Sequence, residues 1–153
     1  MEKPNFRQVK RVARYSEPFT LQARDTEPFK MRISNLGFAD RFEAADKAEL
    51  MVLRYVKGGW TGDDGVVRDA KQPWDFNGET VPLTETVIDM ACTIEAAQIQ
   101  SPKLTFEDLI DLYCIDEDEF LRLAAFSQRT KAPTPDPKDD DSGNSENPTL
   151  PAN

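Results

Sequence analysis

Residues 17–33 read Glu-Pro-Phe-Thr-Leu-Gln-Ala-Arg-Asp-Thr-Glu-Pro-Phe-Lys-Met-Arg-Ile. Apolar and polar side chains alternate over residues 17–24 and again over residues 29–33, and a short polar turn separates the two runs. This period-two alternation on both sides of a turn predicts an antiparallel β-hairpin with one wet face. Because an isolated hairpin is not stable in water, its apolar face needs a helix to cover it.

The stretch after the hairpin has helical spacing and supplies such a helix, over about residues 39–57. Its apolar face is predicted to consist of Phe38, Phe42, Ala45, Leu50, Leu53 and Val56. The pair Gly58-Gly59 is expected to end the helix, since glycine is common just past a helix C-terminus. We expect this helix to cover the hairpin.

Residues 60–82 are rich in turn signals, of which Asn77-Gly78 is the strongest. Trp60 and Trp74 are expected to anchor this irregular segment to the core. Large aromatic side chains are also common at recognition surfaces, so an exposed aromatic surface is the open alternative.

Three helical segments follow. The first is predicted to start at Thr84 and run to about Gln100, with a buried face of Val87, Ile88, Ala91 and Ile94. The second starts at Thr105. The third starts at Asp116, which is predicted to form a capping box with Glu119, while Ile115 and Phe120 form a hydrophobic staple.

The fold class that follows is α+β: an N-terminal β-hairpin packed on a helix, a mainly α-helical half and a disordered acidic tail. Residues 17–129 form the single α+β domain. Residues 1–16 form a basic N-terminal arm, either a contact for phosphate or an acidic partner, or a frayed terminus. Residues 130–153 are rich in Pro and Asp and poor in apolar side chains, which predicts a disordered tail.

The formal net charge of −9 is unevenly distributed. Residues 1–57 carry 12 basic and 8 acidic side chains, whereas residues 58–130 carry 5 basic and 15 acidic ones. An acidic body repels phosphates, so binding of duplex DNA by the whole domain is disfavoured. Such asymmetry is typical of a tail or a contact surface rather than of a catalytic pocket.

The composition also excludes several kinds of catalytic and metal site. The chain has no His, which removes imidazole as base or metal ligand, and its 2 Cys cannot make a four-thiolate site. Cys92 and Cys114 are expected to be reduced and buried, and a disulfide between them is the open alternative. We therefore expect a non-enzymatic protein without a cofactor or a resident metal, although catalysis by paired carboxylates stays formally open.

Two acidic clusters and one helical pair suggest more specific roles. The cluster Asp116–Glu119 fails the calcium-loop pattern, because Leu121 and Ser127 stand where that loop needs Gly and Glu. Its acids fit a helix N-terminus instead. Loop acids Asp63, Asp64 and Asp69 could bind a hard cation only as a minor alternative. Residues 106–126 resemble a helix–turn–helix in outline, but the acidic start of the second helix favours a packed helical pair.

No apolar run approaches the roughly 20 residues of a membrane span, and no secretory signal is visible. A cytoplasmic location is therefore expected.

Two stretches resemble tail assembly chaperones of tailed bacteriophages: residues 53–60, Leu-Arg-Tyr-Val-Lys-Gly-Gly-Trp, and residues 75–84, Asp-Phe-Asn-Gly-Glu-Thr-Val-Pro-Leu-Thr. The similarity covers roughly residues 17–100. It implies a non-enzymatic helper in the host cytoplasm that binds the tape-measure protein and helps to recruit tail-tube subunits. Oligomerisation and a longer frameshifted form are left open. Under this interpretation the candidate partner contacts are Trp60, Trp74 and Phe76, together with any exposed face of the helix over residues 84–100.

Two other functions compete with the chaperone interpretation. One is a structural virion adaptor, a head–tail or baseplate component that stays in the finished particle. The other is an acidic, nucleic-acid-mimicking inhibitor of a host protein, suggested by the strong negative charge of residues 58–130.

Overall fold

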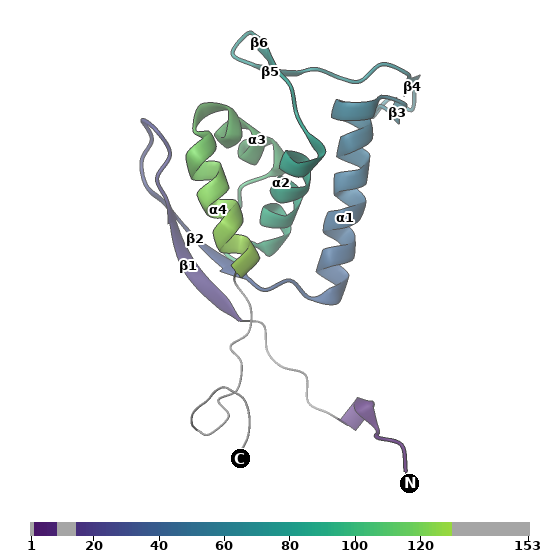
Figure 1. Ribbon diagram of the computed structural model, residues 1–153, viewed down its shortest axis with the longest axis vertical. Helices are drawn as coiled ribbons and strands as arrows, with labels where there is room; N and C mark the ends of the chain where they lie inside the picture. Colours follow the sequence, from purple (N-terminus) through teal and green to yellow (C-terminus); the bar gives the residue numbers. More distant parts are fainter. Residues whose placement is uncertain (1, 9–14, 130–153) are drawn as a thin grey trace, which may run out of the picture.

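The computed structural model describes residues 2–8 and 15–129 (Figure 1). The predicted tail lies outside these residues, and so do residues 1 and 9–14 of the predicted basic arm. Residues 2–8 of the arm are exposed, and its last predicted residue, Ser16, already belongs to the first strand. The elements in chain order are η1 (Phe6–Gln8), β1 (Ser16–Leu21), β2 (Phe29–Ser34), α1 (Phe38–Val52), η2 (Leu53–Lys57), β3 (Trp60–Thr61), β4 (Val67–Arg68), β5 (Trp74–Phe76), β6 (Glu79–Val81), α2 (Glu85–Ala97), α3 (Phe106–Ile115) and α4 (Glu117–Arg129).

The predicted N-terminal hairpin is confirmed. Strands β1 and β2 pair antiparallel, and Phe19 lies opposite Met31. The side chains of Phe19, Leu21, Met31 and Ile33 are buried, as the alternation predicts. Together with the four α-helices of the described chain, this hairpin makes the molecule an α+β protein.

The hairpin packs chiefly against α2 and α4, and α1 lies on the far side of α2 (Figure 1). The prediction that the helix after the hairpin covers it is therefore wrong. Helix α2 is better suited to the centre, because its buried face carries the larger apolar side chains. The predicted members of that face, Val87, Ile88, Ala91 and Ile94, are all buried. Helix α2 contacts α1, α3, α4 and β2.

The predicted apolar face of the helix after the hairpin is buried only in part: Leu53 and Val56 are half-buried, and the side chain of Phe38 lies outside what the structure describes. Phe42 is 57% exposed and Leu50 61% exposed, and Ala45 is exposed as well. The stripe that α1 buries consists of Ala44, Ala48, Val52 and, continuing into η2, Tyr55. Both stripes have helical spacing, so periodicity alone does not choose between them. Alanine lets two helices approach closely, and α2 packs against the alanine stripe.

The predicted end of this helix is confirmed. After Val52 the chain continues for one π-helical turn, η2, which closes with a hydrogen bond of 2.8 Å from the Gly58 N–H to the Leu53 carbonyl oxygen. Gly58 has a φ of 91°, and a Cβ atom there would collide with the Asp69 carbonyl oxygen. Glycine is therefore required where the chain leaves the helix.

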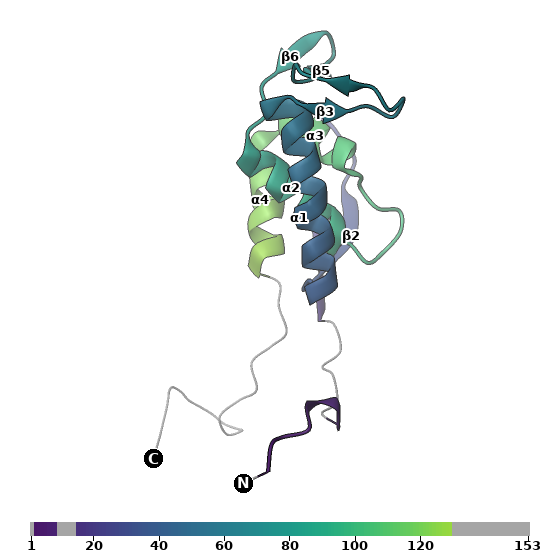
Figure 2. The same cartoon turned by 90° about the vertical axis from the view of Figure 1, so that its right-hand side faces the viewer.

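Residues 60–81 form two small antiparallel hairpins, β3–β4 and β5–β6, which the turn signals did not predict as strands. The predicted turn at Asn77-Gly78 is confirmed: both residues have positive φ, 52° and 87°, as the tight turn of a two-residue hairpin requires. Both small hairpins lie at the same end of the helices (Figure 2).

The starts of α2 and α3 are as predicted. The Thr84 hydroxyl accepts a hydrogen bond of 3.2 Å from the Val87 N–H. Thr105 caps α3 through a complete capping box, in which its hydroxyl accepts from the Asp108 N–H and the Asp108 carboxylate accepts from the Thr105 N–H. Helices α3 and α4 form the packed pair that their sequence favours.

The start of α4 is only half as predicted. Asp116 caps the Glu119 N–H at 3.2 Å, but Glu119 does not return the bond, because the Asp116 N–H donates to Leu112 of the preceding helix. The predicted staple between Ile115 and Phe120 stays a prediction. Ile115 is 39% exposed, and the Phe120 ring lies edge-on to Tyr113 at 5.4 Å.

Candidate partner-binding surface

Trp60, one of the three predicted partner contacts, lies between two arginine side chains. The guanidinium carbon of Arg54 is 4.6 Å from the centroid of the indole ring, and that of Arg68 is 5.1 Å away, distances at which cation–π attraction operates. The indole N–H donates to the Ala70 carbonyl oxygen at 2.9 Å. Trp60 thereby ties the β3–β4 hairpin to η2, and its side chain stays half-buried.

The loop acids beside Trp60 are engaged by the same arginines. Asp64 accepts two hydrogen bonds from Arg68, which hold the pKa of its carboxyl to about 2. The Asp63 carboxylate oxygen Oδ1 lies 3.8 Å from the Arg54 guanidinium nitrogen Nη2. Among the residues that the structure describes, no group of three or more Cys, Asp or Glu side chains is arranged to hold a metal ion. The cation alternative for this loop gains no support.

Trp74 anchors the β5–β6 hairpin to the core. Its ring lies edge-on to Tyr55 at 5.2 Å and to Phe106 at 6.2 Å, and Tyr55 and Phe106 are both buried. The buried indole N–H has no hydrogen-bond acceptor in good geometry. Trp74 thus fulfils the structural role expected for it, and its large aromatic area explains how a three-residue strand is held in place.

Phe76 ends β5 opposite Glu79 and is half-buried. It shares the small-hairpin end of the molecule with Trp60 and Trp74 (Figures 1 and 2). The contacts of the two tryptophans differ, since one packs on arginines and the other on the core. A partner contact through any of the three stays a prediction.

A groove that the sequence did not predict runs between α1 and the first turns of α2. It has a volume of about 650 Å³. Its apolar lining consists of Ala45, Ala48, Val52 and Leu53, and its polar lining of Asp46, Glu49, Lys57, Glu85, Thr86 and Asp89. Leu50 follows Asp46 by one helical turn and precedes Leu53 by one, so an exposed leucine adjoins the groove.

The charge around this groove is predominantly negative. Asp46 and Glu49 on α1 face Glu85 and Asp89 on α2, with Lys57 as the single cation of the lining. On the other side of the α1–α2 contact, by contrast, Lys47 and Glu95 form an ion pair of 2.6 Å. The two helices therefore neutralise their charges along one side of their contact and leave them unneutralised along the other.

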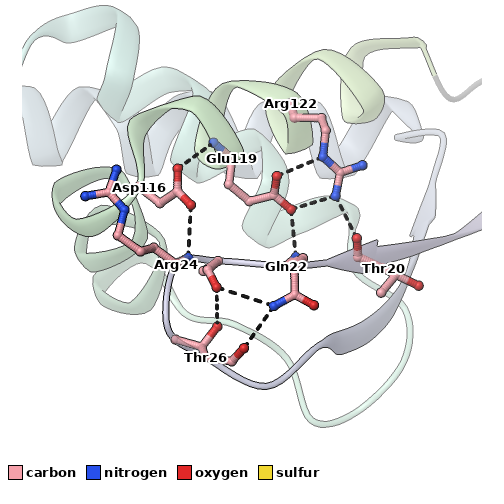
Figure 3. A network of polar contacts seen from close by, with 8 residues as sticks. Thr20, Gln22, Arg24, Thr26, Asp116, Glu119 and Arg122 are labelled. Atoms are coloured by element: carbon pink, nitrogen blue, oxygen red, sulfur yellow. Dashed lines mark hydrogen bonds and ion pairs between the residues drawn. The ribbon is translucent and has the colours of Figure 1, made fainter.

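A second polar cluster joins α4 to the hairpin (Figure 3). The Glu119 carboxylate accepts a hydrogen bond of 2.7 Å from the Gln22 N–H, and the Asp116 carboxylate accepts one of 3.0 Å from the Arg24 N–H. Arg122 donates to Glu119 and, at 2.7 Å, to the Thr20 carbonyl oxygen. These side chains occupy backbone groups along the outer edge of β1 and its continuation, so the cluster has a structural role.

The remaining shifted pKa values have local causes. Burial raises the pKa of the Cys92 thiol to about 12 and also raises that of Cys114. Both cysteines are free, as expected, but only Cys92 is buried and Cys114 is half-buried. Burial likewise raises the pKa of Asp111, against a smaller effect of the Trp74 indole in the opposite direction. These groups lie apart from the groove lining.

Comparison of this chain with protein families, with curated proteins and with solved structures finds no match in any of the three. Within residues 2–8 and 15–129, no helix has both the length and the apolar character needed to cross a bilayer.

Proposed function

We propose that this chain is a non-enzymatic tail assembly chaperone of a tailed bacteriophage, which binds the tape-measure protein and helps tail-tube subunits to assemble around it in the host cytoplasm. The proposal takes its specific content from the resemblance of residues 53–60 and 75–84. Its structural support is the exposed apolar surface of α1.

The observation that carries the proposal is the apolar surface of α1. Leu50 is 61% exposed and adjoins a groove with an apolar lining and a charged border. A chaperone must offer apolar surface to its client and stay in solution, and a net charge of −9 favours solubility. The absence of His and the local causes of the shifted pKa values agree with a protein that binds rather than catalyses.

The decisive experiment is co-expression of the full chain with the tape-measure protein of the same genome. We expect the tape-measure protein to move into the soluble fraction and to co-purify with this chain. The proposal is wrong if neither the solubility nor the chromatographic mobility of the tape-measure protein changes.

Mass spectrometry of purified virions separates the chaperone from the structural adaptor. A chaperone leaves the particle, so we expect no peptides of this chain in finished virions. Stoichiometric recovery of its peptides from virions would favour the adaptor instead.

A further inference from the structure

We propose that the groove between α1 and α2 binds an amphipathic helix of the partner protein, with apolar side chains along one face and Lys or Arg on both sides of that face. The inference rests on the proposed function and names the binding surface and the chemistry of the partner segment.

The shape of the groove suits a helix. One wall of the groove runs from Ala45 in α1 to Lys57 in η2, which corresponds to about 18 Å of helix axis if 1.5 Å per residue is taken throughout. That length accommodates roughly three turns of a docked helix, whose side chains at positions i, i+3, i+4 and i+7 anchor it in an apolar groove. Since helices line both walls, the groove provides no strand edge to which an extended peptide could pair.

The apolar lining gives such a helix something to cover. Ala45 and Ala48 are small, so they leave room for the larger side chains of a partner, and Val52 and Leu53 extend the apolar lining from α1 into η2. Leu50 exposes 61% of its surface next to this lining. Docking a partner helix would remove the exposed apolar surface of Ala45 and Leu53 from water, which is favourable in proportion to the area buried.

The charges select the kind of helix. Asp46, Glu49, Glu85 and Asp89 line the groove, and none of their side chains forms an ion pair with another described residue. Lys57 is the only basic residue of the lining. A helix with Lys or Arg beside its apolar stripe complements these acids, whereas an acidic helix meets like charges. A second copy presenting the same groove would also bring like charges together.

Fluorescence anisotropy on the full chain tests the proposal with two designed peptides. Both carry leucines at helical spacing, one with Lys and Arg flanking them and the other with Glu at the same positions. We expect only the basic peptide to bind, with an affinity that falls as salt is added. Equal binding of both peptides, or binding of neither, would overturn the proposal.

A matched pair of variants locates the site. The double variant Asp46→Lys/Glu49→Lys replaces attraction by repulsion at two positions and is expected to weaken binding about tenfold. Glu43→Lys reverses an exposed acid on the same helix outside the groove lining, so its affinity should stay unchanged. Similar effects of the two substitutions would sink the assignment, provided that thermal unfolding shows each variant to be folded.

The chain's own basic N-terminal segment is the competing occupant. If the basic peptide binds only after Lys3 and Arg7 are replaced by Ser, that segment holds the groove and the inference of a partner helix is wrong. Co-expression separates this inference from the proposed function. If the Asp46→Lys/Glu49→Lys variant solubilises the tape-measure protein as well as the original chain does, the proposed chaperone function stands. The groove is then not the binding site.

Discussion

At the residue scale, Asp116 and Glu119 connect the ends of the described domain. Their carboxylates accept hydrogen bonds from the backbone N–H groups of Arg24 and Gln22, which continue the outer edge of β1 beyond its last residue, Leu21. Exposed strand edges invite pairing with other chains, and charged side chains are one way of covering them. The acidic start of α4 thus protects an edge as well as capping a helix.

A first prediction concerns the Glu119 carboxylate, whose pKa is lowered chiefly by hydrogen bonds from Arg122 and also by the Gln22 N–H. A carboxyl with a lowered pKa in the folded state stabilises the protein above its ordinary value of 4.5, and this contribution is lost as the pH falls through the folded-state pKa. We therefore expect Glu119→Gln to reduce the free energy of unfolding by about 1 kcal/mol at pH 7. Urea unfolding of the original chain and the variant at pH 7 and pH 3 measures this change in the free energy of unfolding.

The matched control for this prediction is Glu117→Gln, an exposed acid in the same helical turn. It should change stability much less. A destabilisation by Glu119→Gln that stayed the same at pH 3 would show that the lost interaction does not depend on the charge.

At the scale of the element, α1 shows why helical spacing does not identify a buried face when two stripes compete. The stripe through Phe42 carries the larger side chains, but the structure buries the stripe through Ala44 and Ala48. Close approach to α2 decides the matter, because small side chains allow extensive backbone contact between the helices. The exposed apolar surface of α1 is the consequence.

A helix cap depends only on residues close together in the sequence, and substitution of Thr105 tests the contribution of one such cap to stability. We expect Thr105→Ala to reduce the free energy of unfolding by about 1 kcal/mol, because it leaves the Asp108 N–H without its acceptor. Thr105→Ser should restore most of the loss, since serine is an equally good cap. Chemical denaturation of the three proteins measures the effect.

Thr93→Ala is the control for this cap. Thr93 lies inside α2, where its hydroxyl donates to the Asp89 carbonyl oxygen, and alanine is the better helix former at such a position. The capping argument fails if Thr93→Ala is as destabilising as Thr105→Ala.

At the scale of the whole molecule, α2 holds the described structure together. The hairpin, α1, α3 and α4 all contribute side chains to one contiguous core, and α2 contacts each of the three other α-helices as well as β2. Ile88 and Ala91 of α2 are fully buried in that core. Such an arrangement is expected to unfold as one cooperative unit.

Truncation of Ile88 tests this cooperativity. We expect Ile88→Ala to cost about 2–5 kcal/mol, through lost apolar burial and the cavity left behind. The unfolding transitions followed by circular dichroism and by tryptophan fluorescence should still coincide, because Trp74 packs on Phe106 of the same core. Leu121→Ala, at a 40% exposed position of α4, should cost far less. Separate transitions for the two signals would contradict a single unit.

The sequence by itself determined the features that depend on neighbours along the chain. Alternation predicted the β1–β2 hairpin, and side chains that bond the backbone three residues away predicted the helix starts at Thr84, Thr105 and Asp116. Such contacts span a few residues, so their geometry is already set by the local backbone. The prediction that Trp60, Trp74 and Phe76 contact a partner also depends on local sequence, since aromatic residues stand out in a turn-rich segment.

The tertiary structure alone decided which helix covers the hairpin, which face of α1 is buried and where a groove opens. Glu119 meets Gln22 across 97 positions of sequence, and the groove exists only because α2 lies against the alanine stripe of α1. The physical reason is that burial is decided by competition among all the apolar faces of the chain. The more apolar of the two helices, α2, takes the centre, and α1 is left with Phe42 and Leu50 at the surface.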